Sequence, residues 1–364
     1  MSKTLFFYIS KHNFKWIFLT FLGLSSLAFI INSIEQTRRA LSRIKLDFFF
    51  ELKLSLLQLP KFMELLLPFS VLFGAMLSIS FLNRHHEIIM ARASGISLRQ
   101  FIMPCVFVAF IYGLFSILVL NPISSNFKKH HEFLVNTVIK GKETSIEMTA
   151  NGFWLHTKTD QGYQVIHATE VIPPLFTMIR VYFLDFDHNH QLIKRIDGQS
   201  ALLDQGQWNI QNAWVSTWGN GQKSEYQSSY ILPTKLTHHE IINALAPADS
   251  IPIWDLPHFI SMFKAHGFPT RDHELQFNGL LSTPLLFIAL VIFGSLFSIY
   301  IPRFGTNFWG FAIGVGIGFL IYILDQIFFS LGGSGALPIW IATWTPAIAT
   351  SLFSFSWLIH REEK

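Results

Sequence analysis

Six apolar segments, each long enough to cross a lipid bilayer, constrain the fold of this 364-residue chain more than any other feature. A bilayer core of roughly 30 Å needs about 20 consecutive apolar residues in a helix. Without water, only helices and closed barrels satisfy their backbone polar groups. We therefore predict a membrane α-helical protein with six transmembrane helices. These are Trp16–Ser33, Lys61–Leu82 (kinked at Pro68, with a start as early as Phe48 left open), Phe101–Leu120, Leu280–Ile301, Phe308–Phe329 and Leu337–Leu358.

The composition agrees with this class, because only 14% of residues are charged and 51% are hydrophobic, whereas soluble domains carry about a quarter charged residues. No basic run interleaved with aromatic residues is present, so a nucleic-acid partner is not expected. The single cysteine, Cys105, lies in an apolar run and predicts a buried thiol. Trp16–Ser33 is longer than the apolar region of a signal peptide, so we interpret it as a retained first helix.

The short loops predict the orientation. Lysines before the first span and arginines in two further loops fall on one side of a six-span chain, which the positive-inside rule makes cytoplasmic. Both termini are then cytoplasmic, and the long insert is extracytoplasmic. One loop departs from the rule, because basic residues follow span one on the outer side: Arg38, Arg39, Arg43 and Lys45.

The insert at residues 123–277 separates the first three spans, in residues 1–122, from the last three, in residues 278–364. Its residue pattern differs from that of the spans. Short β-branched or aromatic runs alternate with turn signals, which predicts an all-β domain: a sandwich, a jelly roll or a partly open barrel. One helix is expected at Asp255–His266, with Pro257 in its first turn. The predicted strands cover residues 153–159, 163–169, 178–185, 191–196 and 208–215.

Motifs for catalysis are missing from the sequence. Gly219-Asn-Gly-Gln-Lys-Ser224 has the wrong spacing for a phosphate-binding loop, and neither a nucleophile elbow nor a His-Glu-x-x-His motif occurs. The histidine pairs are poor chelators, because adjacent residues point in different directions. We predict no enzymatic activity, no metal site and no cofactor bound by this chain; any ATP and Mg²⁺ would belong to a partner ATPase.

The polar stretch at 84–95, between the second and third apolar segments, predicts a short helix with a C-terminal cap. Gly95 suits a C′ position, and Ser97-Leu-Arg-Gln100 forms a capping box for the next span. Helical spacing places His85, Ile88, Ile89 and Arg92 on one face and Glu87, Met90, Ala91 and Ser94 on another. From these residues alone, a helix lying on the bilayer and a helix docked to a cytoplasmic partner both remain open.

Glu87-Ile-Ile-Met-Ala-Arg-Ala-Ser-Gly95 resembles the coupling-helix motif of the LptF/LptG family of lipopolysaccharide-export permeases. The plan of three spans, a β insert and three spans matches that family over nearly the whole chain. Features closer to the LptG branch are Asp325-Gln-Ile-Phe328, Leu337-Pro338 and the run from Ile30-Ile31-Asn32 through Glu35-Gln36 to Arg38-Arg39. Asn32 departs from the pattern, because LptG-like proteins often carry a lysine there.

The resemblance implies one half of an ABC permease in the inner membrane of a Gram-negative bacterium, with a periplasmic β-jelly-roll domain. Its implied partners are a homologous LptF-like permease, an LptB-like ATPase dimer, LptC/LptA-like jelly rolls and lipopolysaccharide itself. The coupling site would comprise Arg84, Glu87, Met90, Arg92 and Ser94, with Glu87 transmitting the ATP-driven motion. Arg38 and Arg39 would contact lipid A phosphates. We favour this contact over snorkelling or pairing with Glu35 and Asp47, because positive charge on the outer side is otherwise disfavoured.

Two features of the fifth span bear on assembly. Gly310, Gly314 and Gly318 form a small-residue stripe that permits close helix approach, and we favour a subunit interface over packing within the chain. Asp325 is expected near the outer interface, with no role in proton transfer.

Two alternatives to the transporter function remain: a non-transporting scaffold, and a mechanotransmission subunit that links an ATPase to periplasmic partners. A lipid route needs an open apolar slot in the β domain, whereas an adaptor needs a closed core.

Overall fold

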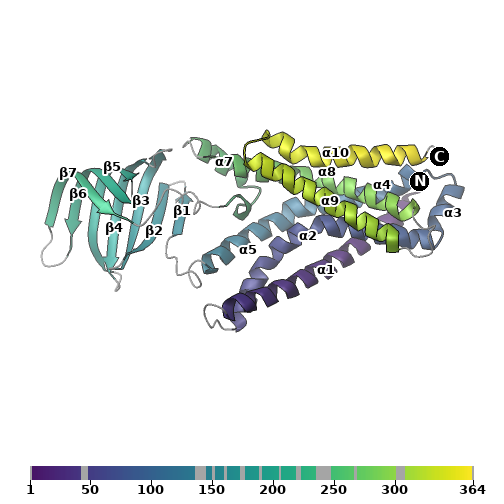
Figure 1. The fold of residues 1–364 in the computed structure, drawn as a ribbon, viewed down its shortest axis with the longest axis horizontal. Helices are drawn as coiled ribbons and strands as arrows, with labels where there is room; N and C mark the ends of the chain where they lie inside the picture. Colours follow the sequence, from purple (N-terminus) through teal and green to yellow (C-terminus); the bar gives the residue numbers. More distant parts are fainter. Residues whose placement is uncertain are drawn as a thin grey trace. The chain divides into compact units, whose positions relative to one another are not determined.

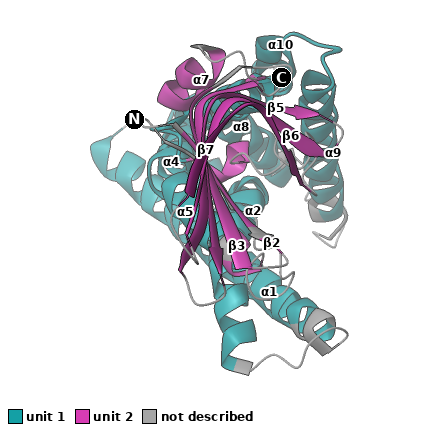
Figure 2. Ribbon diagram, turned by 90° about the vertical axis from the view of Figure 1, so that its left-hand side faces the viewer, with its two compact units in different colours: residues 1–131, 252–256, 271–364 teal, residues 132–251, 257–270 magenta. Residues whose placement is uncertain are grey.

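The fold is known from a computed structural model. It describes residues 2–41, 48–135, 145–149, 152–159, 162–172, 177–187, 191–204, 206–218, 223–234, 247–265, 269–300 and 308–362. The chain forms two compact units (Figures 1 and 2). Unit 1 comprises residues 1–131, 252–256 and 271–364, and unit 2 comprises residues 132–251 and 257–270.

Unit 1 is a bundle of long helices. Its N-terminal half contains α1 (Lys3–Leu41), α2 (Phe48–Arg84), the short α3 (Glu87–Ala93) and α4 (Leu98–Phe115). A five-residue π-helix, η1 (Ser116–Leu120), joins α4 to α5 (Asn121–Leu134). The C-terminal half contains α8 (Arg271–Tyr300), α9 (Phe308–Gly333) and α10 (Ile339–Glu362). Helix α2 begins at Phe48, the earlier of the two starts that the sequence left open.

Five helices in the described part of the chain are long and apolar enough to cross a membrane: Lys3–Gln36, Phe49–Arg84, Leu98–Glu132, Arg271–Ile299 and Ala312–Gly333. The predicted count of six is therefore not confirmed. Helix α10 has 24 residues, but tryptophan, serine and threonine side chains dilute its apolar character. The third segment also extends beyond its predicted end at Leu120, because η1 and α5 continue the helix.

Two glycines allow helix backbones to meet inside unit 1. A Cβ on Gly74 of α2 would collide with the backbone of Ile17 on α1, including its nitrogen at 2.7 Å. A Cβ on Gly113 of α4 would lie 2.5 Å from the Cα atom of Pro284 on α8. Small residues at such crossings let membrane helices gain van der Waals contact. The sequence analysis did not single out either glycine.

Within the described residues, unit 2 is built on a seven-stranded antiparallel sheet in which each strand pairs with the next along the chain. Figure 2 shows that this sheet is strongly curved. The strands are β1 (Ser145–Thr149), β2 (Gly152–Thr159), β3 (Gly162–Ile172), β4 (Thr177–Asp187), β5 (Leu192–Asp204), β6 (Gln207–Thr217) and β7 (Lys223–Pro233). Strands β2 to β6 each overlap one of the five predicted runs, although β5 continues to Asp204, beyond its predicted end at residue 196. The predicted turns fall largely on residues outside the described part of the chain.

The predicted jelly roll is not confirmed, because the described strands follow the order of a simple meander, whereas a jelly roll consists of two Greek keys. The sequence analysis also missed the two edge strands. β1 has only five residues, and β7 is mostly polar and exposed, so neither shows the alternation that marks a half-buried strand.

One face of the sheet carries the core of unit 2, and a helix covers part of it. Trp208, Phe153 and Phe183 are fully buried in this core. Helix α7 (Leu256–Ala265) inserts Phe263 into the same cluster and packs Phe259 and Met262 against it. This helix confirms the one predicted at Asp255–His266. By this packing, α7 closes part of the sheet's apolar face.

Candidate functional site

The polar stretch between α2 and α4 forms a tight corner rather than one continuous helix. Helix α2 runs through Arg84, and α3 does not begin until Glu87. Between them His86 adopts a left-handed conformation with φ of 59°, which is uncommon for a residue with a Cβ. The helix predicted from Arg84 to Ser94 is therefore divided, and Arg84 belongs to the last turn of α2.

The C-terminal cap predicted for this short helix is present in the structure. The Gly95 amide donates to the Arg92 carbonyl at 3.0 Å, and the Ile96 amide donates to the Ala91 carbonyl at 3.1 Å. With φ of 83° at Gly95, these two bonds define a Schellman motif. The Ser97 hydroxyl then accepts a hydrogen bond from the Gln100 amide at 3.3 Å and caps α4. The corner is therefore fixed by its own backbone bonds.

Burial divides α3 differently from the predicted faces. Ile88 and Ala91 pack into the bundle, whereas Ile89 and Met90 are 59% and 58% exposed. Arg92 and Ser94 are also exposed. The structure thus brings Ile89, Met90, Arg92 and Ser94 to the surface of one short, capped helix.

Glu87 lies at the start of α3 and is half-buried. Its Oε1 atom accepts a hydrogen bond from the Tyr8 hydroxyl of α1 at 3.1 Å. This contact ties the first helix to α3 at a point 79 residues away in sequence. The hydrogen bond therefore links α3 to α1, and the coupling role predicted for Glu87 stays a prediction.

The predicted phosphate-binding residues lie at the opposite end of α1 from Tyr8. Arg38 is exposed and pairs with Glu35 at 3.0 Å, one turn earlier on the same helix. The side chain of Arg39 lies outside the described residues. Asn32 is buried, and its amide nitrogen has no hydrogen-bond partner among the described residues. The predicted phosphate contact of Arg38 and Arg39 stays a prediction.

Two members of the predicted glycine stripe face α2 of the same chain. A Cβ on Gly314 would approach the Met76 sulfur at 2.8 Å, and one on Gly318 would collide with the Leu72 side chain. The surroundings of Gly310 lie outside the described residues. These two glycines therefore serve packing within the chain, and their use at a subunit interface stays a prediction.

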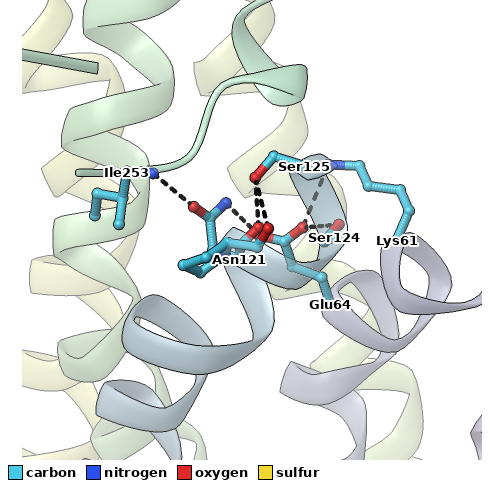
Figure 3. Close-up of polar contacts among 7 residues, drawn as sticks. Lys61, Glu64, Asn121, Ser124, Ser125 and Ile253 are labelled. Carbon is cyan, nitrogen blue, oxygen red and sulfur yellow. Dashed lines mark hydrogen bonds and ion pairs between the residues drawn. The ribbon is translucent and has the colours of Figure 1, made fainter. Parts of the chain in front are cut away.

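A second polar site, which the sequence analysis missed, lies where α2 meets α5. The Glu64 carboxylate accepts hydrogen bonds from Asn121 Nδ2 at 3.0 Å and Ser124 Oγ at 2.9 Å, and Lys61 Nζ lies 3.5 Å away. Figure 3 shows Asn121 between Glu64 and Ile253, whose backbone amide donates to Asn121 Oδ1 at 3.0 Å. We call Lys61, Glu64, Asn121 and Ser124 the Glu64 cluster.

The Glu64 cluster joins three parts of unit 1. Glu64 belongs to α2, Asn121 begins α5 directly after the π-helix, and Ile253 lies in the segment 252–256 that returns from unit 2. Single π-helical turns within α-helices are often found at functional sites. Glu64 could have indicated the site from sequence alone, because it lies within an apolar run. A charged side chain in a membrane span costs free energy and is usually functional.

A cavity of about 190 Å³ adjoins this cluster. Lys61 and Glu64 contribute to its wall together with Asp325 of α9, and apolar side chains such as Leu72 and Phe287 line the remainder. Among the described residues, no group of three His, Cys, Asp or Glu side chains is arranged to hold a metal ion. The cavity therefore combines an apolar wall with charged groups at its edge.

Long apolar helices that precede and follow an inserted β sheet in the sequence define a multi-pass membrane protein with a large β domain. The family model of the lipopolysaccharide export system permease LptF/LptG matches residues 7–361, and the chain belongs to this family. It is similar to the lipopolysaccharide export system permease protein LptG of Haemophilus influenzae, with 25% identity covering 90% of each chain. It is also similar to LptG of Escherichia coli K12, with 24% identity over 98% of this chain and 97% of the relative.

Proposed function

We propose that this chain is an LptG-like permease subunit of an ABC transporter that extracts lipopolysaccharide from the inner membrane. In this proposal α10 is the sixth span, both termini are cytoplasmic and the β unit is periplasmic. The chain pairs with a homologous LptF-like permease, and a cytoplasmic LptB-like dimer supplies ATP hydrolysis. Its β unit passes the glycolipid to LptC/LptA-like jelly rolls. Membership of the LptF/LptG family supports this assignment.

The observation that carries the proposal is the exposed surface of α3. Large apolar side chains at Ile89 and Met90 stand beside the charged Arg92 on a helix whose two ends are fixed by backbone bonds. A rigid helix that presents apolar anchors with a charged neighbour suits a groove on another protein. The Tyr8–Glu87 hydrogen bond offers a route by which motion of that groove reaches α1.

The direct test is co-purification of the tagged chain from its native membrane. We expect a second permease and a soluble ATPase to be recovered with it. Glu87→Ala should weaken ATPase association or uncouple hydrolysis from transport, since the link to Tyr8 is lost. Tyr8→Phe is the matched variant, because it removes only the hydroxyl donor of the same bond. Normal assembly and transport by the Glu87 variant would refute the coupling role.

The outer basic residues provide a separate test of substrate handling. Replacing Arg38 and Arg39 by glutamate should reduce lipopolysaccharide photo-crosslinking, because these guanidinium groups are proposed to contact lipid A phosphates. Arg38→Glu alone is compared with Arg99→Glu, because each changes the charge by the same amount, one at either end of the bundle. Crosslinking that survives the outer substitutions would leave Arg38 with only its ion pair to Glu35.

One observation favours a second candidate, a mechanotransmission subunit that does not itself carry lipid. Helix α7 fills part of the apolar face of the sheet with Phe259, Met262 and Phe263. Acyl chains entering this face would have to displace those side chains. Crosslinkers placed at Phe183 and at Phe287 separate the two candidates. A lipid carrier yields lipopolysaccharide adducts at both positions, whereas a mechanotransmission subunit yields none in the β unit.

A further inference from the structure

A row of paired residues crosses the sheet of unit 2 on the face opposite its core. Each member is the registered partner of the next across neighbouring strands, from β2 to β7. Side chains alternate between faces along a strand, and the immediate neighbours of the row, such as Phe153 and Phe183, are buried in the core. The row is Trp154, His167, Tyr182, Asp197, Trp214 and Tyr226.

The two ends of this row differ in exposure. At the β2–β4 end the rings lie close together. The ring centroid of His167 is 4.3 Å from that of Trp154 and 4.6 Å from that of Tyr182. His167 itself is buried. At the other end Trp214 and Tyr226 are 54% and 50% exposed, with centroids 5.4 Å apart. The first end stabilises the sheet through cross-strand pairs. The second presents a broad aromatic surface to solvent.

Asn212 holds the exposed end in place through two side-chain hydrogen bonds. Asn212 of β6 has φ of 52°, a left-handed conformation that asparagine adopts more readily than most residues. Its side-chain oxygen accepts a hydrogen bond from the Tyr226 hydroxyl at 2.8 Å, and its amide nitrogen donates to Gln199 at 2.6 Å. These bonds fix the ring of Tyr226 before any ligand arrives.

The charges beside this surface neutralise each other. Arg195 donates two hydrogen bonds to Asp197, at 2.7 and 2.6 Å, and its guanidinium lies 5.7 Å from the Tyr182 ring. Short hydroxyl side chains occupy much of the remaining face, including the Ser216–Ser224 pair at 3.0 Å. The surface therefore combines flat rings with fixed hydrogen-bonding groups, and the Arg195–Asp197 pair beside it carries no net charge.

We propose that Trp214 and Tyr226 form a binding surface for uncharged pyranose rings, such as those in the saccharide portion of lipopolysaccharide. The C–H face of a sugar stacks on an aromatic ring, while its hydroxyls exchange hydrogen bonds with carboxylate, amide and hydroxyl groups. A phosphate would need an unpaired cation, and the Arg195 guanidinium beside this surface is already paired with Asp197. The inference rests on the proposed function, because it concerns the sugars of the proposed substrate.

The test uses the full-length protein in nanodiscs and a neutral, phosphate-free hexose oligosaccharide as the probe, followed by saturation-transfer NMR. We expect binding to the native protein and a loss of affinity of about tenfold for Trp214→Ala, the scale of one aromatic contact. Trp254→Ala is the matched control, because Trp254 is 64% exposed but lies outside this face. Tyr226→Phe should lose less, since it keeps the ring and gives up only the bond to Asn212.

Two results would overturn the inference: no oligosaccharide binding to the native protein, or equal affinity for the native and Trp214→Ala proteins. Binding of intact lipopolysaccharide, measured in parallel, separates this failure from that of the proposed function. If native protein binds intact lipopolysaccharide but not the oligosaccharide, the sugar surface alone is wrong. If it binds neither, the proposed function fails as well.

Discussion

The α2–α3–α4 corner and the Glu64 cluster both place charged residues within an apolar bundle, yet they are held in different ways. At the corner, local backbone hydrogen bonds from the Gly95 and Ile96 amides fix the shape, and the apolar side chains of Ile89 and Met90 are exposed. In the Glu64 cluster, side chains from separate helices complete one another's hydrogen bonds, and Asn121 is buried.

Because the two sites are held differently, we expect the Glu64 cluster to contribute to stability and the α3 surface to contribute to binding of partners. A buried carboxylate is tolerated only when its oxygens are paired, so the cluster strongly constrains the positions of α2 and α5. An exposed helix that is fixed by its own caps costs little to alter and leaves its apolar side chains free for another surface. We therefore expect substitutions in the cluster to affect folding, and substitutions on α3 to affect assembly.

The largest effect is expected from Glu64→Ala. It leaves Asn121 Nδ2 and Ser124 Oγ, which belong to buried residues, without their shared acceptor, and each buried donor left unsatisfied costs about 1–3 kcal/mol. Chemical unfolding of the purified protein, followed by circular dichroism, measures the change. Glu64→Gln is the control and should lose less, because its amide oxygen still accepts one bond. Equal stability of native and alanine proteins would contradict the structural role of the cluster.

The second effect concerns backbone contact within the bundle. Gly113→Ala should lower the free energy of unfolding by about 2 kcal/mol, since its new methyl group would collide with the backbone of Pro284. Gly316→Ala provides the matched control, because a Cβ at Gly316 of α9 meets no atom within 4 Å. The same unfolding measurement applies. If both variants lose equal stability, helix propensity or the bilayer, rather than the α4–α8 contact, determines the result.

The third prediction tests the corner itself. Gly95→Ala should cost about 1 kcal/mol, because alanine is disfavoured at the positive φ of the Schellman motif. Gly95→Asn should recover part of this loss, since asparagine tolerates the left-handed conformation better. Proteolysis at the corner reports local opening directly. Equal protease sensitivity of the alanine and asparagine variants would show that backbone conformation does not maintain the corner.

A smaller effect is expected from pH in the β unit, at a carboxylate less completely paired than Glu64. Burial raises the pKa of Asp185, although a 2.5 Å hydrogen bond from Gln164 opposes the shift. The folded state therefore binds this proton more tightly than the unfolded state, and stability falls as pH rises from the usual aspartate range through the raised pKa. Asp185→Asn should flatten this dependence in unfolding measured across that window. An unchanged slope would exclude Asp185 as its source.

The same contrast explains what the sequence could predict. The corner was largely predictable because its determinants are local: Gly95, Ser97 and Gln100 form caps within a few residues. Its division at His86 was not, since no local signal marks a histidine for positive φ. The Glu64 cluster depends on residues 57 and 60 positions apart, which only tertiary packing brings together. The aromatic row of the sheet likewise requires the register of strands β2 to β7, which periodicity alone does not determine.

The smallest effect on stability is expected on the exposed face of α3, where the effect on assembly should be greatest. Met90→Ala and Ile89→Ala should change the free energy of unfolding by less than about 0.5 kcal/mol, because both side chains already face solvent. ATPase recovery in co-purification should nevertheless fall strongly if these residues are anchors in a partner groove. Ile88→Ala is the converse control: Ile88 is buried, so its loss should destabilise the bundle before it affects the partner. Equal recovery with the native chain and the Met90 variant would indicate that α3 rests on lipid, and that its exposed apolar side chains face the bilayer surface instead of a protein.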